Sequence, residues 1–331
     1  MPVFVGPGAL SGSGFEASNN KVGIPTATSD PSPANLGDMY LHTVGSGTTL
    51  MVYNGTEFKE ITIAGSVQAT GGTKSTSGNK TIHTYTGPGN FVVSTGGIFN
   101  YLLVGGGGGT GFDVGGAGGA GGLHYKEDVP LSATTYPVVI GGGGTPGPGQ
   151  NQRGTNGSDS TFNGLTAGGG GGGGSYQNAG PGSTGNSGGG SGGGAGASSS
   201  SGGSSPGTGT HPGGTNIVSP PSGWGGDGGD SNPNTWSTGA GGGSGGDATN
   251  PPGPNAVHDA SNHTTYSISG SNANYAGGGY GNSDGGTIYQ TGKDKSNSTI
   301  GVYGFGANST GAPNTSPYPG NAGVLIISYD T

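Results

Sequence analysis

Residues 101–122, YLLVGGGGGTGFDVGGAGGAGG, place four bulky apolar residues directly before a run of five glycines. Uncharged apolar residues of this kind are typical of a buried β-strand. The glycines that follow suit either a flexible linker or a backbone that packs closely against other backbone. The choice between these two alternatives decides the class of protein.

The composition excludes several classes. The chain has 331 residues, 87 of them glycine, and only 27% are hydrophobic and 7% charged. Disordered chains usually combine low hydrophobicity with high charge, but no Lys or Arg occurs between Arg153 and Lys293. The net charge of −8 argues against a nucleic-acid partner, because phosphate binding needs clustered Lys and Arg. The absence of cysteine excludes disulfides and thiolate metal sites.

The chain shows no targeting segment that we can identify. The N-terminal sequence MPVFVGPGALSGSG lacks the basic and apolar regions of a secretory signal. No apolar run approaches the ~18 residues of a membrane span. We therefore expect a protein without a membrane span that reaches the outside of a cell by lysis, as a virion part does.

The sequence divides into three parts. Residues 1–36 are rich in Gly, Pro, Ser and Asn, which predicts an extended N-terminal arm. Residues 37–65 contain TTLMVY and TEFKEITI on either side of Asn54-Gly55, which predicts a small β-hairpin module with a type I′ turn. Residues 66–331 form the glycine-rich part.

The glycine-rich part begins and ends with predicted strands. The β-prone stretches are TIHTY (81–85), GNFVVST (89–95), IFNYLLV (98–104), TTYPVVIGG (134–142) and VLIISY (324–329). No stretch predicts an α-helix. If the C-terminal strand pairs with strands near residues 80–104, it closes the intervening chain into one unit. An unstructured loop of that length is improbable in a compact domain, so we expect the glycines to be ordered.

The stretch GGAGGAGG (115–122) has a three-residue period. Polyproline II helices have three residues per turn and no internal hydrogen bonds. Copies without side chains can approach until the backbone N–H groups meet neighbouring C=O groups. We therefore predict a bundle of polyglycine II helices in residues 105–122 and much of 141–254. A collagen triple helix is excluded, because glycine does not occur strictly at every third position.

Catalytic and metal-binding patterns are weak. Nothing singles out a pair of carboxylates for hydrolysis. Residues His258, Asp259 and His263 could ligate a metal with further help, but they form a lone cluster in a polar loop. Asp227 and Asp230 could bind Ca²⁺, but acids that solvate a glycine turn explain them as well. We predict no enzymatic activity, no cofactor and no metal.

Aromatic residues stand out among the Gly, Ser and Asn of the later chain. Trp224, Trp236, Tyr275 and Tyr280 are the residues that we predict to contact a receptor, because aromatic rings suit recognition loops on a rigid scaffold. The alternative is that these rings pack across the ends of the glycine bundle.

Several stretches together resemble a known family. The stretch LGDMYLHTVGSGTTLMVYNGTEFKEI (36–61) resembles small β modules of tailed-bacteriophage tail fibres. A second set is similar to the glycine-rich domain of such fibres and of some receptor tyrosine kinases. Its stretches are HTYTGPGNFVVSTGGIFNYLLVGGGGG, GGAGGAGGLHYKEDVPLSATTYPVVIGGGG, NGSDSTFNGLTAGGGGGG and GNAGVLIISY.

The resemblance implies a fold and a function. The fold is all-β, with a β-sandwich like that of tumour necrosis factor and polyglycine II helices inserted between its strands. The function is that of a structural virion protein on the exterior of the tail, a short tail fibre or fibre-tip adhesin that attaches to a host surface glycan or protein. A homotrimer is implied, and we expect the N-terminal arm to dock to another virion protein.

Two other functions stay open. A depolymerising tailspike enzyme would show paired carboxylates in a cleft. A glycine-rich matrix or ice-binding protein would present regularly spaced Thr or Ser on a flat face, and the sequence has no long regular Thr spacing.

Overall fold

The protein forms two compact units, residues Met1–Gly65 and Ser66–Thr331, each described by itself. The computed structural model describes residues 17–18, 21–22, 26–32, 35–44, 47–61, 67–149, 152–176, 182–183, 185–186, 190–196, 225–231, 237–248, 263–282, 291–292, 299, 301–309 and 318–330. These residues form strands, turns and extended segments but no helix, which confirms the predicted all-β class.

The first unit contains a four-stranded sheet in the order β3-β4-β5-β6. Its strands are β3 Thr26–Ala27, β4 Met39–Val44, β5 Gly47–Tyr53 and β6 Phe58–Ile61. Strand β3 pairs in parallel with β4, and the Tyr40 hydroxyl donates to the Asp30 carboxylate over 2.5 Å. Residues 26–32 therefore join this sheet instead of the predicted arm. Before them, β1 (Ala17–Ser18) and β2 (Lys21–Val22) form an antiparallel pair.

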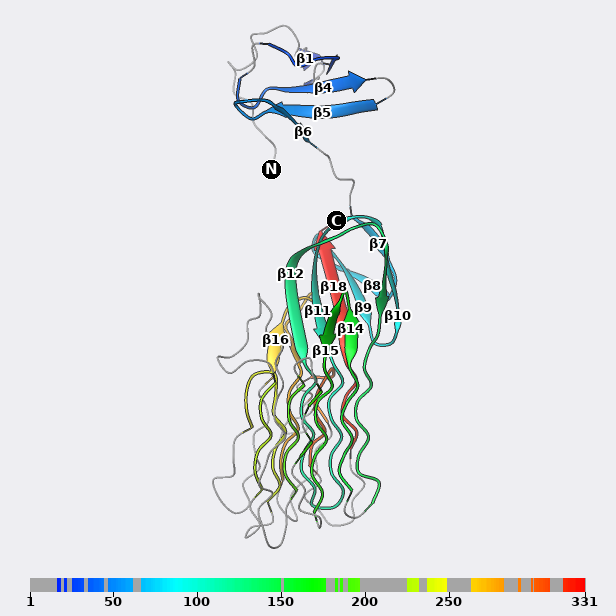
Figure 1. Ribbon diagram of the computed structural model, residues 1–331, viewed down its shortest axis with the longest axis vertical. Helices are drawn as coiled ribbons and strands as arrows, with labels where there is room; N and C mark the ends of the chain where they lie inside the picture. The colour runs from blue at the N-terminus through cyan, green and yellow to red at the C-terminus, as the bar shows by residue number, and fades with distance from the viewer. Residues whose placement is uncertain are drawn as a thin grey trace. The chain divides into compact units, whose positions relative to one another are not determined.

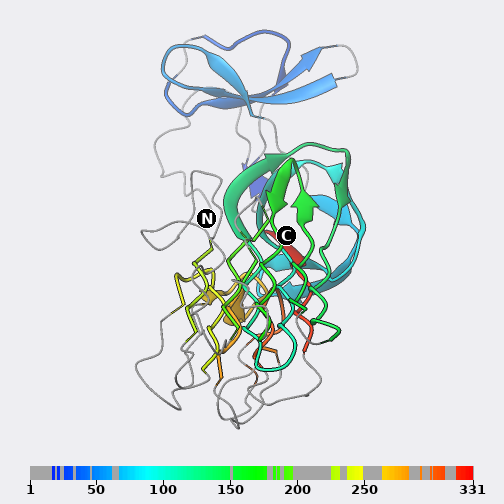
Figure 2. The ribbon, with the colours of Figure 1, turned by 60° about the horizontal axis from the view of Figure 1, so that its bottom comes forward.

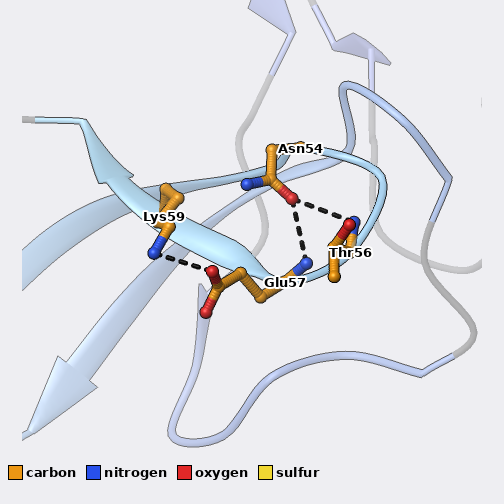
Figure 3. Close-up of polar contacts among 4 residues, drawn as sticks. All are labelled: Asn54, Thr56, Glu57 and Lys59. Atoms are coloured by element: carbon orange, nitrogen blue, oxygen red, sulfur yellow. Dashed lines mark hydrogen bonds and ion pairs between the residues drawn. The ribbon is translucent and has the colours of Figure 1, made fainter.

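The predicted hairpin of the first unit is present, but its turn differs from the prediction. Tyr53 pairs with Phe58, so the loop has four residues and closes by a hydrogen bond from Asn54 N–H to the Glu57 carbonyl. The Asn54 side chain accepts from the N–H groups of Thr56 (2.9 Å) and Glu57 (3.0 Å), as Figure 3 shows. Asn54 is not among the described non-glycine residues with a positive φ, which a type I′ turn would require. The type I′ prediction is wrong because Asn54 acts through its side chain.

The second unit contains two larger antiparallel sheets. The three-stranded sheet has the order β13-β10-β7, with β13 Thr135–Val138, β10 Gly89–Thr95 and β7 Gln68–Thr70. The five-stranded sheet has the order β12-β11-β18-β9-β8. Its strands are β12 Leu123–Leu131, β11 Gly97–Val104, β18 Val324–Asp330, β9 Lys80–Tyr85 and β8 Thr73–Ser77.

The C-terminal strand lies at the centre of the five-stranded sheet. Strand β18 pairs with β11 on one side and β9 on the other, both antiparallel. The ends of the glycine-rich part are thus held together, as the position of VLIISY in the sequence predicts. Every residue from Val324 to Tyr329 is buried, which explains why this strand lacks the polar alternation of a surface strand.

Both faces of the five-stranded sheet are covered. Leu325, Ile327 and Tyr329 of β18 belong to a core shared with Phe91 and Val93 of β10, so the two sheets pack as the layers of a β-sandwich. Val324 and Ile326 point to the opposite face, into a second core with residues of the hairpin formed by β16 (Thr264–Tyr266) and β17 (Ala273–Tyr275). A further hairpin joins β14 (Ser160–Phe162) to β15 (Leu165–Ala167) and caps the first core with Phe162.

The glycine segments leave the sandwich at one end and run side by side, as Figure 1 shows and the turned view of Figure 2 repeats. Residues 105–112 hydrogen-bond through their backbone N–H groups to three other segments in rotation. The N–H groups of Gly105, Gly108 and Gly111 donate to the carbonyls of Gly122, Gly119 and Gly116 at 2.8–3.0 Å. The next positions, Gly106 and Gly109, donate to Ser158 and Thr155, and the third positions, Gly107 and Thr110, donate to Asn321 and Tyr318.

This rotation of partners has a three-residue period, and successive bonds to one partner descend by three residues. A segment with three residues per turn presents its N–H groups in three directions, which is the pattern a polyglycine II bundle requires. The polyglycine II assignment of the glycine segments stays a prediction, with which this hydrogen-bond pattern agrees. The relation of the sandwich to tumour necrosis factor stays a prediction.

The packing also explains the order of residues in GGAGGAGG. A Cβ atom added to Gly116, Gly118, Gly119 or Gly121 would lie 2.0–2.4 Å from a backbone oxygen of a neighbouring segment. Ala117 and Ala120, at the third positions, are completely buried and accommodated. Two of every three positions therefore require glycine, and the third leaves room for one methyl group.

We predict that Gly118→Ala destabilises the second unit by ~1–3 kcal/mol or more, because its Cβ would meet the Gly108 carbonyl oxygen at 2.0 Å. Gly118→Val would cost more still. Gly142→Ala is the control, because a Cβ there meets nothing within 4 Å. Thermal unfolding measures both, and equal melting temperatures for the two alanine variants would contradict the packing.

One buried histidine makes stability depend on pH. His83 on β9 is completely buried beside Phe91 and Tyr329. Its Nδ1–H donates to the Gly71 carbonyl over 2.6 Å. Burial lowers the pKa of His83 below its ordinary 6.5, more strongly than the Gly71 hydrogen bond raises it, and the Lys74 charge lowers it further.

We predict that the second unit loses stability as the pH falls below 6.5. The unfolded chain takes up a proton there, while folded His83 resists it, so stability is full above pH 6.5 and declines towards the lowered folded pKa. His83→Gln should flatten this part of the curve of melting temperature against pH. His42→Gln, in the other unit, should leave the curve of the second unit unchanged, and a curve unaffected by His83→Gln would refute the assignment.

Candidate binding surface of the glycine-rich unit

The outer segments of the bundle carry polar side chains in a three-residue pattern. In residues 154–159, Gly154 and Gly157 are buried against the neighbouring segments. Thr155 and Ser158 are exposed, whereas Asn156 and Asp159 are half-buried. The repeat of glycine followed by two polar residues therefore marks a segment on the outside of the bundle, in contrast to the Gly-Gly-Ala repeat of the interior.

The half-buried side chains of Asn156 and Asp159 accept hydrogen bonds that a neighbouring segment's backbone carbonyls would accept inside the bundle. The Asp159 carboxylate accepts from Gly169 N–H over 2.8 Å, and the Asn156 amide oxygen accepts from Gly172 N–H over 3.0 Å. Donors and acceptors are each three residues apart, so the side-chain oxygens follow the same period as the backbone carbonyls inside. Asn186 then links the row, donating to Asp159 over 2.8 Å.

The end of the bundle opposite the sandwich, which we call the distal end, begins at the turn Phe112–Val114 between two glycine segments. A buried polar network lies there. Asn282 N–H donates to the Thr238 hydroxyl, which lies 2.8 Å from the Ser309 hydroxyl. Ser309 in turn donates to the Gly115 carbonyl over 2.8 Å. This network joins four segments that are far apart in the sequence.

Many stretches of the chain start from the distal end. The described segments that stop there end at residues 149, 176, 196, 231, 282 and 309. The stretches that follow them in the sequence are 150–151, 177–181, 197–224, 232–236, 283–290 and 310–317. They lie outside the described residues. The hydrogen-bonded scaffold therefore brings the ends of these six described segments together at one end of the bundle.

The predicted contact residues fall into two groups. Tyr275 on β17 is 2% exposed and belongs to the second core, with its ring stacked near Tyr303. Tyr280 is 5% exposed and packs against Ala240, while its N–H donates to the Asn308 side chain. Burial removes both rings from any partner's reach, so the structure favours the alternative in which they pack within the unit. Trp224 and Trp236 lie outside the described residues, and their role stays a prediction.

Two general properties of the described part of the chain bear on its chemistry. It contains no group of three or more His, Asp or Glu side chains arranged to hold a metal ion. It also contains no helix with the length and hydropathy that crossing a membrane would require.

Asn156 and Asp159 are residues whose role the sequence analysis missed. Their signal was present, since both follow a glycine by two positions and recur at an interval of three. The three-residue period of the interior extends to these polar side chains, and this pattern separates outer from inner segments.

We predict that Asn156→Leu destabilises the unit by ~1–3 kcal/mol, because it leaves the Gly172 N–H without an acceptor. Asn156→Asp keeps an acceptor and should cost less. Ser158→Ala, on the exposed face of the same segment, should be neutral. Chemical denaturation measures the three variants, and an Asn156→Leu protein as stable as Ser158→Ala would disprove the role.

Comparison with known proteins places the second unit in a family. A search of curated proteins finds no match to the chain. The sequence pattern of a family described as "Glycine-rich domain" matches residues 83–330. The match begins at β9 and ends in β18, so it spans the bundle together with most of the five-stranded sheet. The chain belongs to this glycine-rich domain family.

Proposed function

We propose that the chain is a structural virion protein of a tailed bacteriophage, a short tail fibre or fibre-tip adhesin that attaches the particle to the host cell surface. The observation that carries this proposal is that six described segments of the glycine bundle end at the distal end. Recognition residues concentrate on loops that a rigid scaffold positions. A bundle held by backbone hydrogen bonds lets the sequence that follows these segments change without altering the scaffold.

The tail-fibre part of the proposal also rests on the resemblance of residues 36–61 and of the glycine-rich stretches to tail-fibre proteins. On this reading the protein is a homotrimer on the exterior of the virion tail. The N-terminal residues dock to another tail protein, and the distal end meets a glycan or protein of the host. Trp236 belongs to the stretch 232–236, which follows a described segment that ends at the distal end, and is the first aromatic residue to test for contact.

The alternative functions have less support. A depolymerising tailspike needs two carboxylates that flank a substrate bond, and the acids in the bundle that the structure describes in detail, such as Asp159, hold backbone N–H groups. A matrix or ice-binding role needs a long regular row of hydroxyls. The exposed hydroxyl pair of Thr145 and Thr155, 3.1 Å apart, is not continued at Pro148.

The proposal is tested by binding of the labelled full chain to a panel of bacterial strains. We expect saturable binding to a subset of strains. A variant in which residues 232–236 and 310–317 are replaced by Gly and Ser of equal length should lose this binding and keep its melting temperature.

The matched control replaces residues 249–262 in the same way, because the described segments on both sides of this stretch lie at the sandwich end of the bundle. This control should bind normally. Binding to no strain, or equal loss in both variants, would contradict the adhesin role. Release of soluble sugar fragments from cell-surface polysaccharide would instead establish the enzymatic alternative.

A further inference from the structure

A groove crosses the outer face of the five-stranded sheet, the face turned away from the three-stranded sheet. It consists of two adjoining cavities of about 250 Å³ and about 190 Å³. Lys80 of β9, Asn100 of β11 and Ser328 of β18 line both cavities. The three residues come from adjacent strands, so the sheet itself fixes their spacing.

The groove begins where the cover of the sheet ends. Along β18, Val324 and Ile326 are covered in the second core, to which Ile268 of the segment between β16 and β17 contributes. Two residues further, Ser328 occupies the same face and lines the open groove. It is only 2% exposed, and its hydroxyl has no hydrogen-bond partner among the described residues. The hydroxyl is not among the buried side-chain atoms that lack a partner, so it is open to the groove and can hydrogen-bond to a ligand there.

A β-bulge orients Asn100. The pairing of β11 with β12 shifts between Phe99 and Tyr101, and the Asp128 N–H opposite donates to the Asn100 side-chain oxygen over 2.8 Å. Asp128 has a φ of +52°, which is unusual for a residue other than glycine. With its oxygen engaged, Asn100 presents its NH₂ group, which has no partner within the described chain. Bulges of this kind often re-aim a side chain next to a functional site.

The lining of the larger cavity combines one cation with apolar surface. Lys80 is its single charged residue, and within the described residues it forms no ion pair. Ile82, Ile268 and the Tyr125 ring supply apolar walls, and Tyr125 is itself held against Tyr266, with 4.5 Å between ring centroids. An ammonium group suits a carboxylate, hydroxyl and amide donors suit sugar hydroxyls, and an aromatic or aliphatic wall suits the C–H face of a sugar ring.

We infer that this groove binds an acidic sugar unit, with the sugar carboxylate at Lys80 and the ring hydroxyls at Asn100 and Ser328. The larger cavity lies just below the ~300–1,000 Å³ of typical ligand sites, which suits a single ring. The second cavity, lined also by Asp128 and Asp330, takes the adjoining unit of an oligosaccharide through its hydroxyls. The inference goes beyond the adhesin role of the distal end and holds or fails without it.

The test titrates the full chain with galacturonic acid and digalacturonic acid, observed by NMR and by tyrosine fluorescence. Galactose tests the need for the carboxylate, and acetate tests the need for the sugar. We expect neutral galactose and acetate to bind about tenfold more weakly than galacturonic acid. Digalacturonic acid should gain nothing over galacturonic acid, because its second carboxylate would lie beside Asp128 and Asp330.

Lys80→Met should lower the affinity for galacturonic acid about tenfold and abolish its advantage over galactose. The matched control is Lys74→Met. Lys74 pairs with His83 on the neighbouring strand, so its side chain shares the inner face of the sheet with His83 and lies on the face opposite to Lys80. This variant should bind like the unaltered protein. Ser328→Ala gives a second, smaller loss if the fold is retained.

Three outcomes would overturn the inference. One is no binding of either acidic sugar, and another is equal loss in the Lys80 and Lys74 variants. The third is acetate binding as tightly as galacturonic acid, which would reduce the groove to a simple anion site. Because the readout is a soluble sugar and not cell attachment, a failure here is separate from a failure of the distal adhesin.

Discussion

The hydrogen bond between backbone groups of neighbouring glycine segments is the interaction on which the second unit depends. Ordering a residue costs roughly 1–2 kcal/mol, and a hydrogen bond returns only about 0.5–1.5 kcal/mol net. The hydrogen bonds therefore about balance the ordering cost. The remaining stability has to come from dense backbone contact, which glycine alone permits, and from the sandwich that holds the segment ends. This explains why the central strand β18 is buried on both faces and closes the unit.

Much of this fold could be predicted from sequence because the strands and the glycine segments each have a clear sequence pattern. Strands such as β10, β11 and β18 are apolar and short, and the three-residue period of GGAGGAGG indicates bundled helices. Strand β12 was missed. Its sequence LHYKEDVPL carries three charges and a proline, since it lies at the sheet edge and several of its side chains face solvent. The parallel pairing of β3 with β4 was missed as well, because two residues carry too little pattern to distinguish a strand from an arm.

The candidate site was harder to predict, because composition does not separate a buried ring from an exposed one. Tyr275 and Tyr280 stand among Gly, Ser and Asn in the sequence, yet Tyr275 fills the junction between the sheet and the bundle, and Tyr280 packs inside the bundle. Because glycine has no side chain, the few aromatic rings of this unit are needed to fill the larger spaces in its interior. The groove on the sheet was also invisible, since Lys80, Asn100 and Ser328 are brought together only by pairing between strands distant in the sequence.

The same packing accounts for the missing Lys and Arg between residues 153 and 293. At the outside of the bundle, glycine N–H groups lose the neighbouring carbonyl that would accept their hydrogen bond. The structure supplies side-chain oxygens instead, from Asp159 to Gly169 and from Asn156 to Gly172. Lys and Arg carry donors only and cannot fill this role, whereas Asn, Asp, Ser and Thr can. The abundance of small polar residues, and the acidic net charge, thus follow in part from terminating a hydrogen-bonded lattice of glycine backbones.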